Sequence, residues 1–296
     1  MPDKNFNFLP QPVPLKEQHW ADDTIQYVSI SCTTYNHESY IKDAIDGFLM
    51  QKTTFPVKIV VFEDCSTDGT KAILEDYEKK YPQLFAMFYQ PVNTYKKPFR
   101  RKAKQIKNKE RDKAKYIALC EGDDYWTDPL KLQKQVEFLE EHPDFMVTSS
   151  GYIKKNRDFE EEDIRANDPS FVNETDRGFE FDLFSKGWLT KTLTSLFRND
   201  QSVLGSIPAY KYARDVHLFY HLLKSGKGYY FKEIFGVYNI HEGGIFSTIP
   251  QLKKDTDHYF IFRELYEINK DEFSRRKYFR CLIRYLNHAI ETPNKT

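Results

Sequence analysis

The sequence predicts an α/β fold built on a mostly parallel sheet with helices on both faces. Three observations predict it: short apolar runs alternate with amphipathic helical segments, polar clusters follow the strands, and the chain is long enough for a large core. Of its 296 residues 40% are hydrophobic, and 44 basic residues balance 44 acidic ones. A nucleic-acid-binding protein is expected to be basic, so that class of function is disfavoured.

The first half of the chain alternates between strand and helix. Buried strands are predicted where apolar runs of strand length occur, at 28–33, 57–62, 84–89, 115–120 and 145–150. Helices are predicted where apolar residues recur every three or four positions, at 38–50, 68–81 and 129–141. Strands that alternate with helices indicate a parallel sheet, because each helix carries the chain back across the sheet.

After Gly151 this alternation ends. The acidic and polar segment 154–177 is expected to be a loop, and the remaining predicted elements are helices at 179–186 and 209–225, a strand at 229–238, and one or two long helices from 255 to about 290. Residues 1–24 are polar and rich in proline, so we expect an arm that lies over the domain.

Targeting signals and metal-binding cysteine motifs are not found. The four cysteines are widely spaced without a CxxC pair, which disfavours a zinc site. The first residues lack the basic and apolar pattern of a signal peptide, and no apolar stretch is long enough to span a membrane. A cytoplasmic protein is therefore expected.

The most informative motif is a turn with three carboxylates, Glu121, Asp123 and Asp124, which follows the apolar run 115–120. Like charges this close are unfavourable unless a cation or protons neutralise them. Oxygen ligands suit Mg²⁺ or Mn²⁺, which often also hold phosphate oxygens. Gly122 allows a sharp turn, and Asp128 is expected to cap the next helix. Both a metal site and a solvated acidic turn remain open.

Two more polar clusters follow predicted strands, at 33–37 and 63–70. Asp64 could accept a hydrogen bond from the imide N–H of a pyrimidine base, and Tyr35 could stack on that base. Asp68 or Ser66 is expected to cap the following helix, which is the structural explanation for this loop.

These motifs, in this order, resemble glycosyltransferase family 2, whose members have the GT-A fold. The resemblance spans roughly 27–247 and is carried by TTYNHESYI, VVFEDCSTDGT, YIALCEGDDYW and ARDVHLFYHLL. It implies inverting transfer of a sugar from a nucleotide-sugar donor, expected to be a UDP-sugar, to a hydroxyl of a glycan or lipid-linked acceptor. Bacterial cell-surface polysaccharide synthesis is the setting that the resemblance implies.

The resemblance also implies roles for individual residues. Those implied to bind the nucleotide are Thr33, Tyr35, Asn36, Asp64, Glu121, Gly122 and Asp123. Those implied to bind Mn²⁺ or Mg²⁺ are Asp123, Asp124 and His241. Glu121 stands where the family has aspartate, so its contact with the donor is a departure from the pattern.

Asp215 matches the family's catalytic base, which removes a proton from the acceptor hydroxyl as it attacks. A carboxylate at a helix start is also an ordinary cap, and without the resemblance that would be the preferred interpretation. Arg214, where the family usually has Glu or Gly, and Trp188 are candidates for acceptor binding.

The resemblance divides the chain by function. It implies an N-terminal arm at 1–24, a GT-A catalytic domain at 25–250, and a C-terminal helical extension at 251–296. Within the catalytic domain, 25–150 would bind the nucleotide sugar and 151–250 the acceptor.

Two basic features suggest peripheral contact with the cytoplasmic face of a membrane. Segment 96–115 carries 11 basic residues against two acidic ones, and it could bind phosphate, a membrane or only solvent. Near the C-terminus, a predicted helix has an apolar face of Phe279, Leu282, Ile283 and Leu286 beside a basic face of Arg276, Arg280 and Arg284. We expect this apolar face to pack on the protein itself, with membrane binding as the alternative.

Two rival functions are a nucleotidyltransferase and a non-catalytic nucleotide-sugar-binding protein of the same fold. The first predicts a glycine-rich phosphate loop after the first strand, and TTYNHESYI is not one. The second is disfavoured because Asp123, Asp124, Asp215 and His241 are all present.

Overall fold

The protein is described here by a computed structural model, covering residues 8–22, 26–94, 108–156, 159–164, 177–182, 190–244 and 250–291. The chain forms two compact units. The first unit comprises Met1–Asp200 and Gly226–Asn239, and the second comprises Gln201–Ser225 and Ile240–Thr296. The functional division predicted from the sequence, with boundaries at 25, 151 and 251, stays a prediction.

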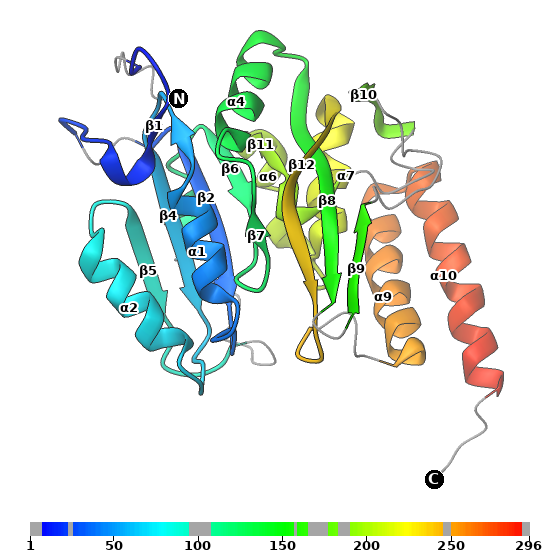
Figure 1. Cartoon of the computed structure of the whole chain (residues 1–296). Coiled ribbons are helices and arrows are strands. Elements are labelled where there is room, and N and C mark those ends of the chain that lie inside the picture. The colour runs from blue at the N-terminus through cyan, green and yellow to red at the C-terminus, as the bar shows by residue number, and fades with distance from the viewer. Residues whose placement is uncertain are drawn as a thin grey trace. The chain divides into compact units, whose positions relative to one another are not determined.

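A ten-stranded mixed sheet forms the centre of the first unit, in the order β10-β12-β8-β11-β6-β2-β4-β5, with β7 beside β12 and β9 beside β8 (Figure 1). Its parallel part has four strands: β2 (Val28–Thr34), β4 (Val57–Glu63), β5 (Phe85–Tyr89) and β6 (Tyr116–Leu119). Ile59, Val60 and Val61 in β4 are all fully buried, as expected for a strand covered on both faces. The predicted parallel α/β arrangement is confirmed here.

The other strands add antiparallel pairings to this sheet. They are β7 (Tyr125–Trp126), β8 (Phe145–Asn156), β9 (Phe159–Ile164), β10 (Arg177–Phe179), β11 (Leu196–Arg198) and β12 (Lys227–Ile240). Strand β11 runs antiparallel to both β6 and β8, so a segment far along the chain completes the middle of the sheet.

The structure differs from the sequence-based expectations at three places in this part of the sheet. The expected loop from 154 instead begins with the end of β8 and strand β9, which pair with each other. Phe179 ends strand β10, so the helix predicted at 179–186 begins later than expected: residues 181 and 182 are helical, and 183–186 lie outside the described residues. Strands β7 and β11 were not predicted, because strands of two or three residues are too short to show a pattern.

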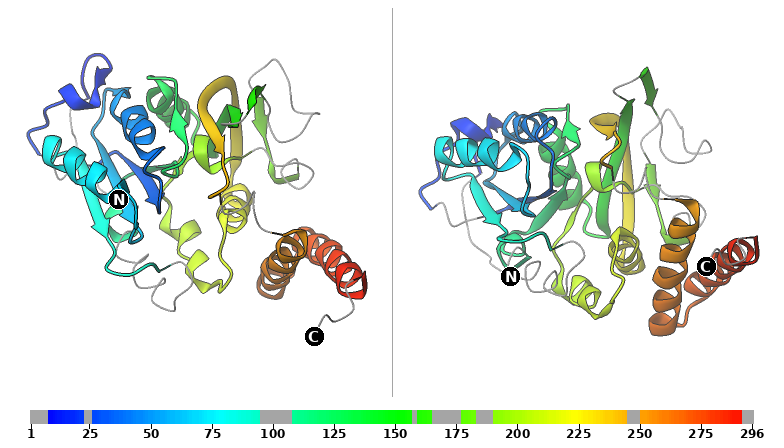
Figure 2. Two further views of the ribbon diagram at one scale, coloured as in Figure 1. Left: turned by 60° about the horizontal axis from the view of Figure 1, so that its bottom comes forward. Right: turned by 90° about the horizontal axis from the view of Figure 1, so that it is seen from below.

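Helices α1 (Ile41–Leu49), α2 (Thr70–Lys80) and α4 (Lys131–Glu141) follow β2, β4 and β7. Figure 2 shows α1 and α2 side by side along one face of the parallel strands. Helix α1 buries Ile41, Ala44, Ile45 and Phe48, the face that its sequence predicts. Helix α4 begins two residues after the predicted start, although the Asp128 carboxylate still accepts a hydrogen bond from the Leu130 N–H at 2.6 Å.

A buried cation lies inside this core. The Lys131 ammonium is fully buried, lies 4.0 Å from the centre of the Trp126 ring and donates to Gln135 Oε1 at 2.7 Å. Burial lowers the pKa of Lys131 to about 7. The Trp126 indole N–H donates to the Leu193 carbonyl at 2.7 Å, which joins β7 to the loop before β11.

The described part of the N-terminal arm packs on the first unit, as expected. Strand β1 (Val13–Pro14) pairs with β3 (Lys52–Thr53), and Leu15 is fully buried. The buried Gln18 amide donates to the carbonyls of Val13 and Thr53 at 2.9 and 2.8 Å. These contacts fix the arm beside the C-terminal end of α1.

The second unit is helical: α6 (Gln201–Leu204), α7 (Asp215–Ser225), α9 (Gln251–Asn269) and α10 (Glu272–Glu291). Helix α7 begins six residues later than predicted, after a short 3₁₀ turn at Ile207–Ala209. Helices α9 and α10 form a hairpin (Figure 2), which turns at Lys270 in the left-handed conformation with φ 55°. Asp271 then accepts hydrogen bonds from the Ser274 N–H at 2.9 Å and the Tyr220 hydroxyl at 2.6 Å, joining α10 to α7.

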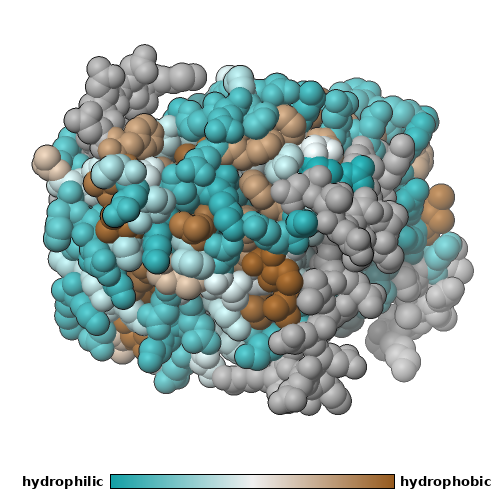
Figure 3. Space-filling model, turned by 45° about the horizontal axis from the view of Figure 1, so that its top comes forward, coloured by the Kyte–Doolittle hydropathy of each residue, from teal (hydrophilic) through white to brown (hydrophobic). Residues whose placement is uncertain are grey.

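Within the described ranges, no helix is both long and apolar enough to cross a membrane. On the face drawn in Figure 3, hydrophilic residues predominate and hydrophobic ones form small separate patches.

Candidate functional site

The C-terminal ends of β2, β4 and β6 bring three polar segments together at one edge of the sheet in the first unit. The strands are parallel neighbours, so their ends must meet. The Gly122 N–H donates to the Thr33 carbonyl at 2.9 Å, and the Asp64 N–H donates to the Thr34 carbonyl at 3.0 Å. The clusters that the sequence places after separate strands therefore form one site, at the edge where ligands bind in open α/β sheets.

Gly122 is required by close packing. A Cβ atom at this position would lie 2.8 Å from both Cβ and Oγ1 of Thr34 and 2.9 Å from Cδ1 of Ile41. No glycine among the described residues has positive φ, so the reason first inferred for Gly122, a sharp backbone turn, is replaced by lack of space. This contact presses the carboxylate turn against the end of β2.

Asp123 lies beside a histidine that was not predicted to belong to the site. His37 Nε2 and Asp123 Oδ2 are 3.7 Å apart, and the Asp123 side chain is 23% exposed. The backbone N–H of His37 donates a hydrogen bond to Thr70 Oγ1 at 2.8 Å, and this contact fixes the loop after β2 to the start of α2. Asp123 is therefore a partly exposed carboxylate held next to an imidazole.

Asp124 points inward. It is 4% exposed, and its Oδ1 accepts a hydrogen bond from the Asn239 N–H at 3.0 Å. The Asn239 side chain donates to the Asp123 carbonyl at 2.6 Å, so β12 and the carboxylate turn hold each other. Burial, followed by the neighbouring charge of Asp123, raises the pKa of Asp124 well above its ordinary value.

Lys191 supplies a positive charge next to this turn. Its Nζ lies 4.6 Å from the centre of the Tyr238 ring and 5.7 Å from that of Tyr152. The backbone carbonyl of Lys191 accepts a hydrogen bond from Ser195 Oγ at 2.7 Å, which fixes the backbone that carries this side chain. The positive charge of Lys191 opposes the rise in the pKa of Asp124 caused by burial. Lys191 has no local signal in the sequence, because its neighbours in the site are distant along the chain.

Asp64 and Tyr35 form the other end of the site. Asp64 is 6% exposed, and its Oδ1 accepts hydrogen bonds from both the N–H and the hydroxyl of Thr94, each at 2.8 Å. Tyr35 is 41% exposed, so its ring face is accessible for stacking. Thr94 was not predicted, and it fixes the orientation of the Asp64 carboxylate.

Asn36 joins two loops of the site. Its backbone is left-handed with φ 54°, its side-chain oxygen accepts from the Thr67 N–H at 2.8 Å, and its own N–H donates to Ser66 Oγ at 3.0 Å. The Asp68 carboxylate accepts from the Thr70 N–H at 3.0 Å and so holds the start of α2, although the N-cap position itself is Gly69 and not Asp68 or Ser66. Asn36 thus orders the loops around Tyr35, while its predicted nucleotide contact stays a prediction.

The predicted base lies in the second unit. Asp215 is exposed at the first residue of α7, and its Oδ1 accepts from the Val216 N–H at 2.9 Å. Arg214 is exposed and donates to the Ala213 carbonyl at 3.0 Å. Two residues after Asp215, His217 is buried, and burial lowers its pKa to about 4, so this imidazole is neutral at pH 7. An exposed carboxylate of this kind can accept a proton from a bound hydroxyl.

The remaining candidates are one histidine in a turn, Trp188 and the basic segment. His241 is partly exposed at the start of a turn closed by a hydrogen bond from the Gly244 N–H to its carbonyl at 3.0 Å. Trp188 lies outside the described residues, as does 96–107 of the basic segment. In its described remainder, Lys113 and Lys115 form ion pairs with Glu110 and Glu140, each at 2.6 Å.

A divalent metal bound at this turn would share its coordination shell between the protein and a bound ligand. Among the described residues, no three His, Cys, Asp or Glu side chains converge as a complete metal site. Magnesium characteristically takes only one or two carboxylates and completes its shell with phosphate oxygens and water. The partly exposed Asp123 provides a carboxylate of that kind, whereas Asp124 is buried against Asn239.

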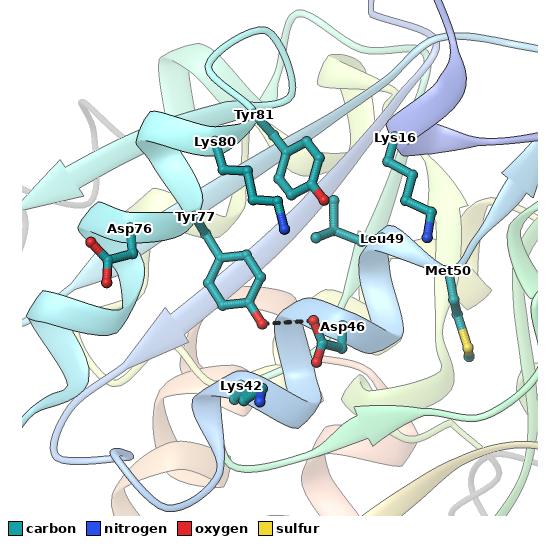
Figure 4. A pocket seen from close by; sticks show the side chains of 9 residues that line it. All are labelled: Lys16, Lys42, Asp46, Leu49, Met50, Asp76, Tyr77, Lys80 and Tyr81. Carbon is teal, nitrogen blue, oxygen red and sulfur yellow. Dashed lines mark hydrogen bonds between the residues drawn. The ribbon is translucent and has the colours of Figure 1, made fainter.

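A separate pocket of about 440 Å³ lies between α1, α2 and the N-terminal arm (Figure 4). Its lining includes Lys16, Lys42 and Lys80, and the Tyr77 hydroxyl points to Asp46 and donates to it at 2.6 Å. None of the residues predicted to bind the nucleotide or metal lines this pocket.

Known proteins with similar sequences or structures include bacterial glycosyltransferases. An uncharacterized protein of Mycobacterium tuberculosis (strain ATCC 25618 / H37Rv) is 45% identical over 120 residues, which are 40% of this chain and 33% of that protein. The matched part of the chain therefore spans about a third of this relative's length. The putative teichuronic acid biosynthesis glycosyltransferase TuaG of Bacillus subtilis (strain 168) is 27% identical over 265 residues, 89% of this chain and 96% of that one.

Solved structures show the same fold. The structure of S. aureus TarS 1-349 with UDP-GlcNAc has a TM-score of 0.63 at 19% identity, covering 90% of this chain and 73% of that one. The mannosyltransferase PcManGT of Pyrobaculum calidifontis with GDP-Man and Mn²⁺ has a TM-score of 0.57 at 15% identity, covering 94% and 80%. Residues 29–183, more than half of the chain, match the family described as "Glycosyl transferase family 2". The chain therefore belongs to glycosyl transferase family 2.

Proposed function

We propose that the protein is an inverting glycosyltransferase that moves a sugar from a nucleotide-sugar donor to a hydroxyl of an acceptor. The observation that carries this proposal is the convergence of three strand ends in the first unit. One end of the site offers Asp64 and the exposed Tyr35, and the other offers the Glu121–Asp124 turn. This arrangement suits a ligand with a base at one end and a diphosphate at the other.

A UDP-sugar is the proposed donor. The Asp64 carboxylate accepts hydrogen bonds, and Thr94 already holds one of its oxygens, so the other could receive the imide N–H of uracil. Structural relatives have been solved with UDP-GlcNAc and with GDP-Man, so these relatives do not decide which base is bound. The proposal of uracil rests on the residues of this chain.

Mn²⁺ or Mg²⁺ is the proposed cofactor, held by Asp123 with Asp124 and His241 as the further predicted ligands. When bound, such an ion neutralises the diphosphate that leaves with the nucleotide. Two structural relatives were solved with Mn²⁺, which supports a metal here. Lys191 would add a fixed positive charge for the same diphosphate, because it lies beside Asp124. Thr33, Glu121 and Gly122 are proposed to line the donor site.

Asp215 is the proposed base. It would accept the acceptor's hydroxyl proton while that oxygen attacks the anomeric carbon from the face opposite the diphosphate. One C–O bond forms as the bond to the diphosphate breaks, so the anomeric configuration inverts. Arg214 and Trp188 remain proposed contacts of the acceptor.

The acceptor is proposed to be a glycan or a lipid-linked glycan in bacterial surface polysaccharide synthesis. The similarity to TuaG over most of both chains supports this setting. The donor and a lipid-linked acceptor would meet at the cytoplasmic face of the membrane.

The test is direct. Purified protein is incubated with UDP-, GDP- and dTDP-sugars, with Mn²⁺ or with EDTA, and release of the nucleoside diphosphate is measured. Metal-dependent release from a UDP-sugar is expected. Binding without release or transfer under any condition would favour the non-catalytic alternative, and pyrophosphate release from a nucleoside triphosphate would favour the nucleotidyltransferase.

A further inference from the structure

Helix α10 of the second unit packs through one face only. On that face Ser274 is fully buried and Cys281 is 7% exposed. Tyr278 and Tyr285 stack on Tyr266 and Tyr259 of α9, with ring centres 5.8 and 5.0 Å apart. These contacts fix the rotation of α10 about its axis, so the orientation of its opposite face is also fixed.

The outward face carries an apolar stripe. Phe279, Ile283 and Leu286 are 46%, 59% and 46% exposed, and their spacing of four and three residues places them on one side of the helix. The expectation that this face packs on the protein itself is therefore wrong for these three residues. Single exposed apolar residues are ordinary, but a continuous row of them marks a surface that binds something.

Positive charge flanks the stripe. Residues 273–287 contain five cations and no carboxylate: Arg275, Arg276, Lys277, Arg280 and Arg284. Arg275 and Arg276 pair with Glu272 at 2.8 and 2.6 Å. Among the described residues, Arg280 and Arg284 form no ion pair. At 100° per residue, Arg276, Arg280 and Arg284 follow one another along the side of the helix next to Ile283.

The local field is positive enough to affect a neighbouring group. Burial, and then the charges of Arg280 and Arg284, lower the pKa of Lys277 below its ordinary value. Two other partners for this face are less suitable. A second copy of the helix would bring like charges together, and a neutral glycan would form no ion pairs with the arginines.

We propose that this face of α10, defined by Phe279, Ile283, Leu286, Arg280 and Arg284, binds the surface of an anionic lipid bilayer. The helix lies parallel to the surface, with its three apolar side chains among the upper acyl chains and its arginines at the lipid phosphates. An amphipathic helix of low net hydrophobicity with arginine beside its apolar stripe is suited to such binding. The inference rests on the proposed function only in explaining how the enzyme would meet a lipid-linked acceptor.

The experiment is co-sedimentation of the full chain with phosphatidylcholine vesicles and with mixed phosphatidylcholine–phosphatidylglycerol vesicles. Binding to the mixed vesicles is expected, with at least about tenfold weaker binding to the neutral ones and loss at about 1 M salt. Because no sugar transfer is measured, failure of the proposed function would leave this result unaffected.

Two variants test the two components separately. Ile283→Asp places a charge in the stripe, and the double variant Arg280→Gln/Arg284→Gln removes the unpaired cations. Each should reduce binding to anionic vesicles at least about fivefold with an unchanged unfolding temperature. The matched controls are Ile268→Asp, which alters an aliphatic residue on α9 that is 50% exposed, and Arg263→Gln, which alters an arginine paired with Glu267. Both controls should bind as the unmodified protein does.

Several results would overturn the proposal. Equal binding to neutral and anionic vesicles would remove the role of charge, and wild-type binding by both α10 variants would place the contact elsewhere. Failure of the unmodified protein to bind anionic vesicles would exclude the surface outright. Self-association in sedimentation velocity that Ile283→Asp abolishes, without vesicle binding, would assign the stripe to a second copy of the chain.

Discussion

Asp64 and Asp123 both follow strands of the parallel sheet, yet their neighbours give them different chemistry. Asp64 is buried and held by Thr94, which suits recognition of one fixed donor group. Asp123 is partly exposed beside His37, which suits an ion or a charged ligand. Their different surroundings lead to separate predictions for base recognition and metal binding.

We expect Asp64→Ala to weaken UDP binding by about 1–3 kcal/mol, the scale of a hydrogen bond to a charged group. Thr94→Val should cause a smaller loss, because it removes one of two hydrogen bonds that orient the carboxylate and leaves the carboxylate in place. Calorimetry on the unmodified protein should also rank UDP above ADP and GDP. Equal affinity for all three would exclude base recognition by Asp64.

Asp123→Ala should abolish most of the metal-assisted binding of UDP, because the partly exposed carboxylate of the turn is the proposed metal ligand. The measurement is UDP titration with Mn²⁺ and with EDTA. The control is Asp144→Ala, which removes a surface carboxylate paired with Lys227 at 3.0 Å. Unchanged UDP affinity of the unmodified protein in EDTA would contradict a metal at Asp123.

Lys191→Met tests the cation beside the turn, since Met keeps much of the aliphatic stem. If Lys191 contacts the diphosphate, UDP binding should weaken by about 1.5–3 kcal/mol while uridine binding stays the same. If it only neutralises the carboxylates, its loss should instead strengthen Mn²⁺ binding and leave UDP affinity intact. The control is Lys80→Met, since Lys80 also lies over a tyrosine ring, 5.3 Å from the centre of Tyr81. A loss of UDP affinity therefore supports contact with the diphosphate, and unchanged UDP affinity contradicts it.

The residues predicted for the site were those with local signals. A carboxylate run, or an aspartate directly after an apolar strand, is visible in the sequence because its position and its chemistry coincide. Thr94, Lys191 and Asn239 had no such signal. Each reaches the site through a contact with a residue 30 or more positions away, and such contacts follow only from the folded arrangement.

In helix α7 one residue has two possible roles, because Asp215 is both the first residue of the helix and the proposed base. Asp215→Asn retains a side-chain oxygen that can accept the Val216 N–H but cannot take a proton. The variant should therefore unfold near the wild-type temperature and bind donor normally, while its transfer rate falls about 10²-fold or more. Glu272→Gln, which changes a first-turn carboxylate of α10, is the control. A near-normal transfer rate in Asp215→Asn would remove this residue from the mechanism.

Elements with a long periodic pattern were predicted well, and those without one were missed. Helix α1 buries the face that its spacing indicates, and β2 and β4 differ from prediction by one residue. The short strand β7 forms because β12 provides its hydrogen-bonding partners, and β11 forms because it pairs with both β6 and β8. In α10 the period correctly predicted an apolar face, but period alone does not say whether a face meets protein or solvent.

For the whole molecule, the pattern of alternating strands and helices was sufficient to predict an α/β fold with a parallel sheet. It was not sufficient to predict two compact units, because the chain enters the second unit at Gln201, returns to the first at Gly226 and leaves again at Ile240. Such crossings depend on the pairing of β12 with distant strands, which no local window of sequence contains.

The stability of the second unit should depend on pH through Asp271, which joins α7, the hairpin turn and α10. Burial alone would raise its pKa, but hydrogen bonds from Ser274, Tyr220 and Lys224 outweigh burial and lower it. A carboxyl with a lowered folded-state pKa contributes stability above its unfolded pKa of about 3.9 and loses it as pH falls towards the folded value. At pH 7, Asp271→Asn should therefore reduce unfolding free energy by about 1–3 kcal/mol. In calorimetric unfolding, the difference between Asp271→Asn and the unmodified protein should shrink steadily below about pH 4. A difference that stays constant from pH 7 down to about pH 2 would show that side-chain shape, and not the charge of Asp271, holds these helices together.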